Sequence, residues 1–172
     1  MPVTPAFLAD LGDIPVITSG PNLRSKSRDF FWYSPVLKRA LDHVQADAIA
    51  TPRTKAEVLE VLAACHRHDV PLTPRGGGTG NYGQAMPLAG GLVLDMTALN
   101  RILDIGQGTV RTEPGILIGA LDEALQGHGQ ELRMHPSTKE TATLGGFIAG
   151  GSGGVGSVRW GPLRAPGNIL AL

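Results

Sequence analysis

Residues 46–80 read ADAIATPRTKAEVLEVLAACHRHDVPLTPRGGGTG, and their pattern predicts the central elements of the fold. A short apolar run at 46–51 predicts a strand. Thr54 and Glu57 form a capping box that starts a helix. The residues that follow place one apolar face along this helix at Val58, Val61, Leu62 and Cys65. A second apolar run at 70–73 predicts another strand. Strand, helix and strand with short connections form a βαβ unit, which we expect to be parallel and right-handed.

The glycine loop RGGGTG, Arg75 to Gly80, follows the second predicted strand directly. Ligands of parallel α/β units bind at the carboxyl ends of the strands. Successive glycine N–H groups can form a concave nest for phosphate oxygens, because glycine adopts positive φ without a Cβ penalty. No helix is predicted after the loop, because residues 84–91 contain Pro87 and two glycines, so a Rossmann fingerprint is disfavoured. A P-loop is excluded because no Gly-Lys-Ser/Thr follows any glycine run.

Glycine is the outlier in the composition. The 172 residues include 24 glycines, about twice the average share of ~7%. They concentrate at 75–91 and 145–161. Two such zones suggest two backbone surfaces that contact one extended ligand, and the alternative is that the glycines only form tight turns.

Charge and cysteine content exclude several classes of function. Lys+Arg and Asp+Glu are equal at 15 each, so the basic excess typical of nucleic-acid binding is missing. Cys65 is the only cysteine, which leaves no disulfide and no cysteine-based zinc site, and we predict no metal. The first 15 residues do not resemble a signal peptide, and no apolar run approaches the ~20 residues of a membrane span. We therefore expect a cytoplasmic protein.

The rest of the chain gives weaker signals. Residues 1–28 contain several prolines and little periodicity, and we expect an irregular lead-in. The aromatic run at 30–33 favours a hydrophobic anchor, and Ser34-Pro35 favours the start of a short helix. Further elements are expected as a strand at 91–96, a hairpin of 102–105 with 109–112, a helix at 117–128, and a strand that begins at 168–172.

A second stretch of chemical interest is HPSTKETATLGGFIAGG at 135–151. Its loop offers hydroxyl groups, and the residues at 144–149 predict a short helix whose small side chains permit close approach by a ring or a phosphate. The hydroxyl-bearing residues are Ser137, Thr138, Thr141 and Thr143. These hydroxyls have an equally simple interpretation as caps and turn formers.

Taken in order, several motifs resemble a known family, the FAD-binding oxidases and dehydrogenases of the vanillyl-alcohol oxidase / p-cresol methylhydroxylase type, near the glycolate oxidase subunit and D-lactate dehydrogenase branch. The resemblance runs from about Asp29 to the last residue. The motifs are PLTPRGGGTG at 71–80, GLVLDM at 91–96, PST at 136–138, ATLGG at 142–146, SGG at 152–154 and WG at 160–161.

This resemblance implies an α+β fold, in which a small βαβ subdomain precedes an incomplete mixed or antiparallel sheet subdomain with helices. It implies FAD as cofactor, with the pyrophosphate on the first glycine loop and the ribityl chain and ring on the second stretch. The implied contacts are Arg75, Gly76, Gly77, Gly78, Thr79, Gly80, Asn81, Ser137, Ala142, Gly145, Gly146, Ala149, Gly150 and Ser152. Thr79 stands where covalent members often carry a histidine, which predicts non-covalent FAD. Ala165 stands where the family frequently has an acidic residue.

Three parts are expected along the chain: an irregular lead-in at 1–28, a first FAD subdomain at 29–90 and a truncated second FAD subdomain at 91–172. The family's substrate domain, which supplies the catalytic base, is not expected within these residues. We therefore assign no catalytic residue, and we interpret His135 as structural or close to the flavin edge.

The leading hypothesis is an FAD-binding portion of an oxidoreductase that oxidises a 2-hydroxy acid or similar alcohol by hydride transfer to flavin. One alternative is a non-catalytic fragment or subunit that folds without flavin, and a weaker one is a generic nucleotide-binding module. The expected partners are a small hydroxy-acid substrate and either a second copy or a chain that supplies the missing domain.

Overall fold

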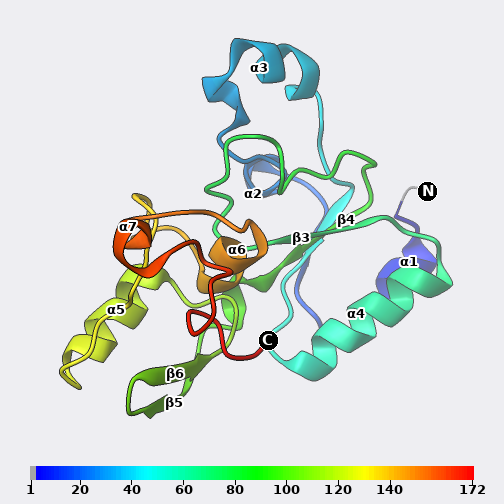
Figure 1. Ribbon diagram of the computed structural model, residues 1–172. Helices are drawn as coiled ribbons and strands as arrows, with labels where there is room; N and C mark the ends of the chain where they lie inside the picture. Colours follow the sequence, from blue (N-terminus) through cyan, green and yellow to red (C-terminus); the bar gives the residue numbers. More distant parts are fainter. Residues whose placement is uncertain (1–2) are drawn as a thin grey trace. The chain divides into compact units, whose positions relative to one another are not determined.

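The computed structural model describes residues 3–172, which divide into two compact units after Leu99 (Figure 1). The first unit holds a four-stranded sheet, and the second unit, from Asn100 to Leu172, holds a two-stranded sheet. No helix within residues 3–172 has the length and apolar character needed to cross a membrane. The two units are described in turn.

The sheet of the first unit has the strand order β1-β2-β4-β3. Its strands are β1 (Val16–Ile17), β2 (Ala48–Ala50), β3 (Leu72–Arg75) and β4 (Leu92–Asp95). Strands β2 and β3 both pair in parallel with β4, and β1 is antiparallel to β2. The predicted strands and their parallel direction are therefore confirmed, and β4 lies between the two strands of the predicted βαβ unit.

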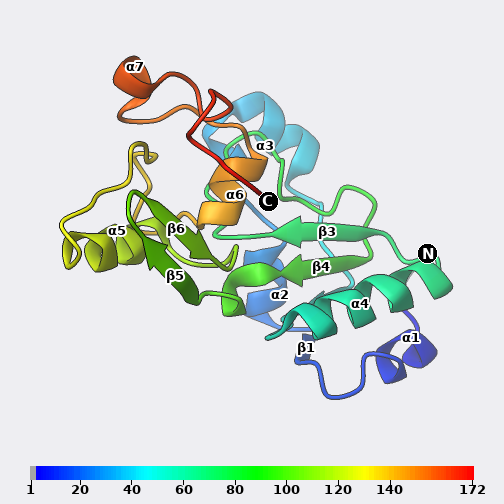
Figure 2. The same cartoon turned by 60° about the horizontal axis from the view of Figure 1, so that its bottom comes forward.

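Helices cover both faces of this sheet (Figure 2). Helix α4 (Lys55–Arg67) begins at Thr54, whose hydroxyl accepts the N–H of Glu57 at 3.1 Å, as the capping box predicts. Its apolar face packs on one side of the sheet, in a buried cluster with residues from α1, β2 and β4. On the other side, Leu23 of helix α2 (Pro21–Lys26) packs against Ile49 and Val93. Successive side chains of β2 and β4 therefore alternate between the two faces of the sheet, and each face carries its own apolar layer.

The N-terminal part differs from the predicted irregular lead-in. Helix α1 (Pro5–Ala9), strand β1 and helix α2 all lie within residues 1–28. Phe7 is fully buried, and Leu11 is 2% exposed. Both helices carry a proline in their first turn, where the missing N–H of proline costs nothing because N–H groups there have no partner within the helix. These prolines therefore mark the starts of helices and not an irregular chain.

Helix α3 (Pro35–Leu41) confirms the helix expected after Ser34, whose hydroxyl accepts the N–H of Leu37. The aromatic run forms the 3₁₀ helix η1 (Phe31–Tyr33). Phe31 is fully buried and serves as the expected anchor, whereas Tyr33 is 68% exposed. A second 3₁₀ helix, η2 (Met96–Ala98), closes β4.

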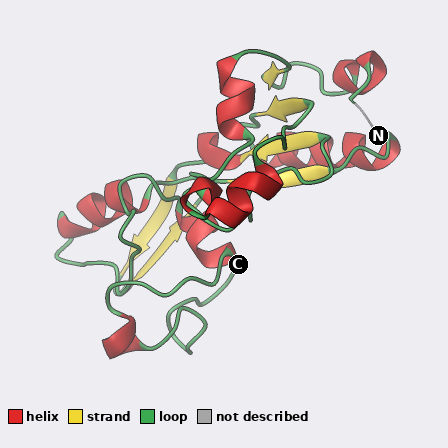
Figure 3. Cartoon of the chain, turned by 90° about the horizontal axis from the view of Figure 1, so that it is seen from above, coloured by secondary structure: helices red, strands yellow, loops and turns green. Residues whose placement is uncertain are grey.

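The second unit begins with a hairpin of β5 (Ile102–Gly106) and β6 (Thr109–Thr112), as predicted. Helix α5 (Ile118–Gln126) lies beside it (Figures 2 and 3). Leu121 and Leu125 of α5 share a buried cluster with Ile105 and Val110 of the hairpin. A second cluster gathers Ile118, Phe147 and Leu163, and it holds helix α6 (Leu144–Ala149) in place.

Two features of the second unit differ from expectation. Residues 168–172 form no strand, and only Ile169 makes an isolated bridge, to Pro166. The division of the chain falls after Leu99 rather than after residue 90, because β4 pairs within the first sheet. The short helix α7 (Ser157–Trp160) lies in the second glycine-rich zone, between Gly156 and Gly161.

Candidate functional site

The glycine loop begins where β3 ends, because Arg75 is the last residue of that strand. Gly78 has a φ of +65°, the left-handed region that favours glycine. The backbone N–H groups of residues 76–81 donate no hydrogen bond to any residue from 3 to 172. A run of free N–H donors on a loop without bulky side chains is the chemistry that an anionic oxygen requires.

The side chain of Arg75 supports the loop from inside. Its Nη1 donates a 2.6 Å hydrogen bond to the carbonyl oxygen of Arg28, and its guanidinium lies against Gly78. Burial lowers the pKa of Arg75, and the nearby carboxylates of Asp95 and Asp29 partly offset that effect. The positive charge of Arg75 therefore lies against the inner side of the loop, at Gly78.

A short segment before the aromatic run ties down the other end of the loop. The N–H of Phe30 donates to the carbonyl oxygen of Gly80 at 2.7 Å. Asp29 is 3% exposed, and its Oδ1 accepts the N–H of Phe31 at 2.9 Å. Its Oδ2 is buried without a hydrogen-bond partner among the described residues. Sequence reasoning missed Asp29, although an acidic residue directly before four aromatic residues is an unusual place for a charge.

Asp95, at the end of β4, is the second buried carboxylate of this region. It forms an ion pair with Lys26, and its Oδ1 accepts both the N–H and the hydroxyl of Thr97, the latter at 2.7 Å. Its charge is thus neutralised by a lysine of α2, and its oxygens are occupied by neighbours. This arrangement fixes η2 to the end of β4.

In the second unit, the predicted contacts around α6 fall into two groups. Gly146, Ala149, Gly150 and Ser152 are exposed. Gly145 instead packs against Pro114: its N–H donates to the Pro114 carbonyl oxygen at 2.8 Å, and a Cβ at Gly145 would lie 2.6 Å from Pro114 Cβ. The glycine at 145 is therefore required by close backbone approach within the unit.

The Ser-Thr loop is similarly divided. Ser137 is exposed, whereas Ala142 is 4% exposed and its N–H donates to the Thr138 carbonyl oxygen at 2.8 Å. Thr143 is buried and caps α6, since its hydroxyl accepts the N–H of Gly146. The capping interpretation of this hydroxyl is confirmed.

His135 belongs to the backbone framework of the second glycine zone. Its backbone forms an antiparallel bridge with Val155, and its Nδ1 lies 3.2 Å from the Pro136 carbonyl oxygen. Gly154 and Gly156 lie so close to residues 133–135 that a Cβ at either position would overlap the backbone. Both glycines are needed for this approach to the backbone.

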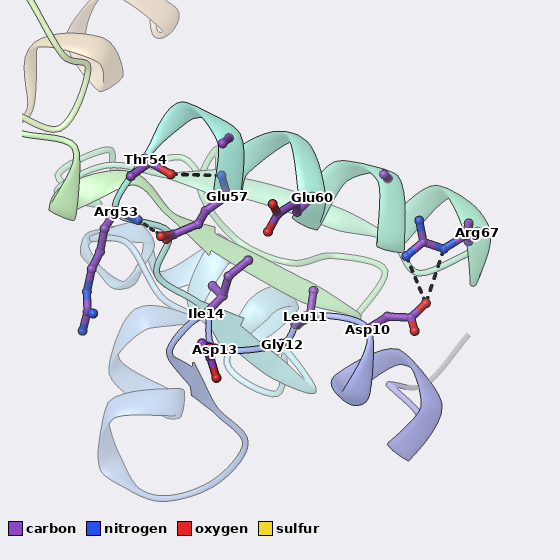
Figure 4. A pocket seen from close by; sticks show the side chains of 12 residues that line it. Asp10, Leu11, Gly12, Asp13, Ile14, Arg53, Thr54, Glu57, Glu60 and Arg67 are labelled. Atoms are coloured by element: carbon purple, nitrogen blue, oxygen red, sulfur yellow. Dashed lines mark hydrogen bonds and ion pairs between the residues drawn. The ribbon is translucent and has the colours of Figure 1, made fainter.

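Two hollows of the surface lie away from the glycine loop. One lies between residues 10–14 and helix α4, where Glu57 accepts the N–H of Arg53 and Asp10 accepts from Arg67 (Figure 4). A second, on α3, is lined by Pro35, Lys38, Arg39 and Asp42. Residues 3–172 contain no group of three or more His, Cys, Asp or Glu side chains that could hold a metal ion.

Residues 46–170 match the family described as FAD binding domain. The chain belongs to this family. The expected recognition is confirmed, and so is FAD as the cofactor of the family. The donor set of the first loop fits this cofactor, because the free N–H groups of residues 76–81 suit the oxygens of a diphosphate.

Curated relatives agree with this assignment. The glycolate oxidase subunit GlcD of Bacillus subtilis (strain 168) is 35% identical over 120 residues, which are 69% of this chain and 26% of that protein. The D-2-hydroxyglutarate dehydrogenase of Escherichia coli (strain K12) is 40% identical over 121 residues, 67% of this chain and 12% of that protein. The D-lactate dehydrogenase of Archaeoglobus fulgidus is 33% identical over 117 residues, 67% of this chain and 26% of that protein. This chain thus spans about a quarter or less of the length of these relatives.

Solved structures confirm the fold. Alkyldihydroxyacetonephosphate synthase superposes with a TM-score of 0.82 at 23% identity, over 94% of this chain and 35% of that chain. A berberine bridge enzyme variant superposes with a TM-score of 0.74 at 18% identity, over 94% of this chain and 34% of that chain. The α+β fold of the p-cresol methylhydroxylase type is therefore the fold of this chain.

Proposed function

We propose that this chain is the FAD-binding part of an oxidoreductase that oxidises a 2-hydroxy acid or similar alcohol. The observation that carries the proposal is the run of free backbone N–H groups at 76–81, placed at the carboxyl end of a parallel strand in a chain of the FAD-binding family. The names of the relatives, glycolate oxidase subunit, D-2-hydroxyglutarate dehydrogenase and D-lactate dehydrogenase, support a hydroxy-acid substrate.

When bound, FAD supplies the acceptor for a hydride from the alcohol carbon. The residues of this chain bind and orient it. The N–H groups of residues 76–81 hold the diphosphate, and the glycines leave room for its close approach. Exposed residues of the second unit, Ser137, Gly146, Ala149, Gly150 and Ser152, are proposed to contact the remainder of the cofactor. Ala142 and Gly145 contribute through packing, since both are held against neighbours within the unit.

Non-covalent attachment is part of the proposal, because Thr79 offers no imidazole for a bond to the flavin. The cytoplasmic location and the need for a further chain or copy stay predictions. Substrate binding and the catalytic base are assigned to no residue of this chain.

Titration of the purified chain with FAD tests the proposal. Quenching of flavin fluorescence and a 1:1 end point are expected, and the bound flavin should be released by denaturation. ATP and NAD serve as competitors, and preference for either would favour a generic nucleotide module. A chain that stays colourless and takes up no added FAD would match the alternative of a fragment that folds without flavin.

A further inference from the structure

The aromatic run at 30–33 contains more than the expected hydrophobic anchor. Phe31 is fully buried, whereas Trp32 is 43% exposed and Tyr33 is 68% exposed. The rings of Trp32 and Tyr33 lie against each other, with centroids 4.2 Å apart and an interplanar angle of 35°. The ring of Phe30 makes edge contacts with both, at 5.7 Å to Trp32 and 6.1 Å to Tyr33. Trp32 and Tyr33 therefore form a stacked pair at the surface, which we call the aromatic platform.

The aromatic platform lies close to the glycine loop. The N–H of Phe30 donates to the carbonyl oxygen of Gly80 at 2.7 Å, so the aromatic run is fastened to the last residue of the loop. Trp32 follows Phe30 by two residues, which places their Cα atoms at most about 8 Å apart. The 3₁₀ helix η1 (Phe31–Tyr33) begins directly after this contact and fixes the backbone of both platform residues. Two exposed aromatic rings thus lie near the backbone that presents the free N–H groups of residues 76–81.

The adenosine end of FAD has no residue of the first unit assigned to it. The loop is proposed to bind the diphosphate, and the implied contacts of the second unit concern the ribityl chain and the flavin ring. One ribose separates the adenine from the diphosphate, so the adenine must bind within the length of a nucleoside from the loop. Every base has a flat π face, and proteins hold such faces by stacking them on aromatic side chains. The exposed rings near the loop have the chemistry that adenine binding requires.

We propose that the aromatic platform binds the adenine of FAD by stacking, while the glycine loop binds the diphosphate. This inference rests on the proposed function of the loop as the FAD diphosphate site. Trp32 and Tyr33 are the binding residues, and Phe30 positions them through its hydrogen bond to Gly80. Phe31 keeps the separate role of the anchor, because its ring is fully buried.

Ligands that carry different parts of FAD separate the platform from the loop. ADP contains both the adenine and the diphosphate, whereas inorganic pyrophosphate contains the diphosphate alone. Trp32→Leu keeps an apolar side chain and removes the aromatic face. W32L should bind FAD and ADP about tenfold or more weakly than the unmodified chain, because base stacking contributes this much to affinity. Its affinity for pyrophosphate should be unchanged, and Tyr33→Leu should act in the same direction. Fluorescence titration measures FAD binding, and displacement of FAD measures the other two ligands.

Two control variants accompany this series. Trp32→Phe keeps an aromatic face and should recover most of the affinity for ADP. Leu59→Ala removes another exposed apolar side chain of the same unit, on α4, and should leave all three affinities unchanged. Equal weakening of ADP and pyrophosphate binding in W32L would show that the substitution disturbs the loop, and this result would overturn the proposal. Unchanged ADP affinity in both W32L and Y33L would overturn it as well.

Tryptophan emission gives an independent measurement of stacking. Trp32 and Trp160 are the two tryptophans of the chain, so Trp160→Phe leaves Trp32 as the single indole. Saturating ADP should quench the emission of Trp32 in this variant, and saturating pyrophosphate should not. Unchanged emission with ADP bound would refute stacking on Trp32. The affinity series does not depend on this variant.

Failure of the platform and failure of the proposed function give different results. If the unmodified chain binds neither FAD nor ADP, both proposals fail together. If it binds both ligands and the platform substitutions leave ADP affinity unchanged, the platform alone fails and the diphosphate site stands.

Discussion

The guanidinium of Arg75 fills the space into which a side chain at Gly78 would project. The loop turns around this side chain, and Gly78 adopts a φ of +65° at the point of contact. Two independent constraints therefore require glycine at this position: the backbone conformation and the buried cation. Gly78 therefore differs from glycines at which the positive φ is the single constraint.

Gly78→Ala is expected to destabilise the first unit more than Gly12→Ala. Gly12 has a similar φ of +56° and nothing within 4 Å of a Cβ, so its substitution carries only the backbone cost of about 1–2 kcal/mol. At Gly78 the same cost is joined by displacement of Arg75 from the Arg28 carbonyl, a hydrogen bond to a charged group worth about 1.5–3 kcal/mol. Urea unfolding of both variants measures the difference, and equal losses would show that Arg75 does not depend on Gly78.

A second pair of glycines makes a matched comparison in helix α6. Gly145→Ala places a Cβ 2.6 Å from Pro114 Cβ and 2.8 Å from the Pro114 oxygen, both of which belong to a rigid ring and its backbone. Such overpacking is expected to cost about 1–3 kcal/mol of unfolding free energy. Gly146→Ala meets only the Thr143 hydroxyl at 3.0 Å, and alanine favours the helix by about 0.5–1 kcal/mol.

Urea unfolding monitored by a signal from the second unit compares the two variants. G145A should lower the unfolding free energy clearly, and G146A should change it by no more than about 1 kcal/mol. A loss in G146A as large as that in G145A would show that the close contact with Pro114 is not what requires glycine at 145.

Elements with a complete local signal were predicted from the sequence. The capping box at Thr54 and Glu57 specifies the start of α4, and the predicted bounds of α6 agree with the structure. Of the apolar face predicted for α4, Val61 and Cys65 are buried, whereas Leu62 is 42% exposed and that part of the prediction is wrong. Local hydrogen bonds and periodicity determine such elements, so neighbouring residues suffice to predict them.

Other features depend on partners distant in sequence. Helices α1 and α2 have only five and six residues, too few for periodicity to show, and the burial of Phe7 against the sheet stabilises this part of the chain. The position of β4 between β2 and β3 is set by backbone hydrogen bonds between strands that are distant in sequence, which local patterns do not reveal. The inward direction of the Arg75 side chain is fixed by its hydrogen bond to the carbonyl oxygen of Arg28, which lies more than forty residues earlier.

Cys65 is expected to be unreactive at neutral pH. Its thiol is 5% exposed on the inner face of α4, and burial raises its pKa to about 11. Because the thiolate is the nucleophile, labelling by a disulfide reagent at pH 8 should be slow in the folded chain and rapid in denaturant. The labelling rate in native buffer should keep rising with pH up to about 11, because the thiolate fraction grows until the pH passes the pKa. Rapid labelling at pH 7 would show that α4 separates from the sheet.

The contact between α1 and the end of α4 should fail in acid. Asp10 accepts from His68 Nε2 at 2.9 Å and from Arg67 Nη2 at 3.0 Å, and these hydrogen bonds lower its pKa below the ordinary value of 3.8. A carboxylate with a lowered folded-state pKa stabilises the fold above its unfolded pKa, and this contribution disappears as the pH falls through the folded value.

The expected result is a stability difference between the unmodified chain and Asp10→Asn that is constant near neutral pH and closes below about pH 3.8. Because the pair lies on the surface, the difference should be small and should shrink in high salt. Urea midpoints between pH 3 and pH 7 measure it. Asp13→Asn, three residues further along and without a hydrogen-bond partner among the described residues, should show no such dependence. A D10N difference that persists unchanged at pH 3 would mean that the charge of Asp10 does not hold α1 against α4.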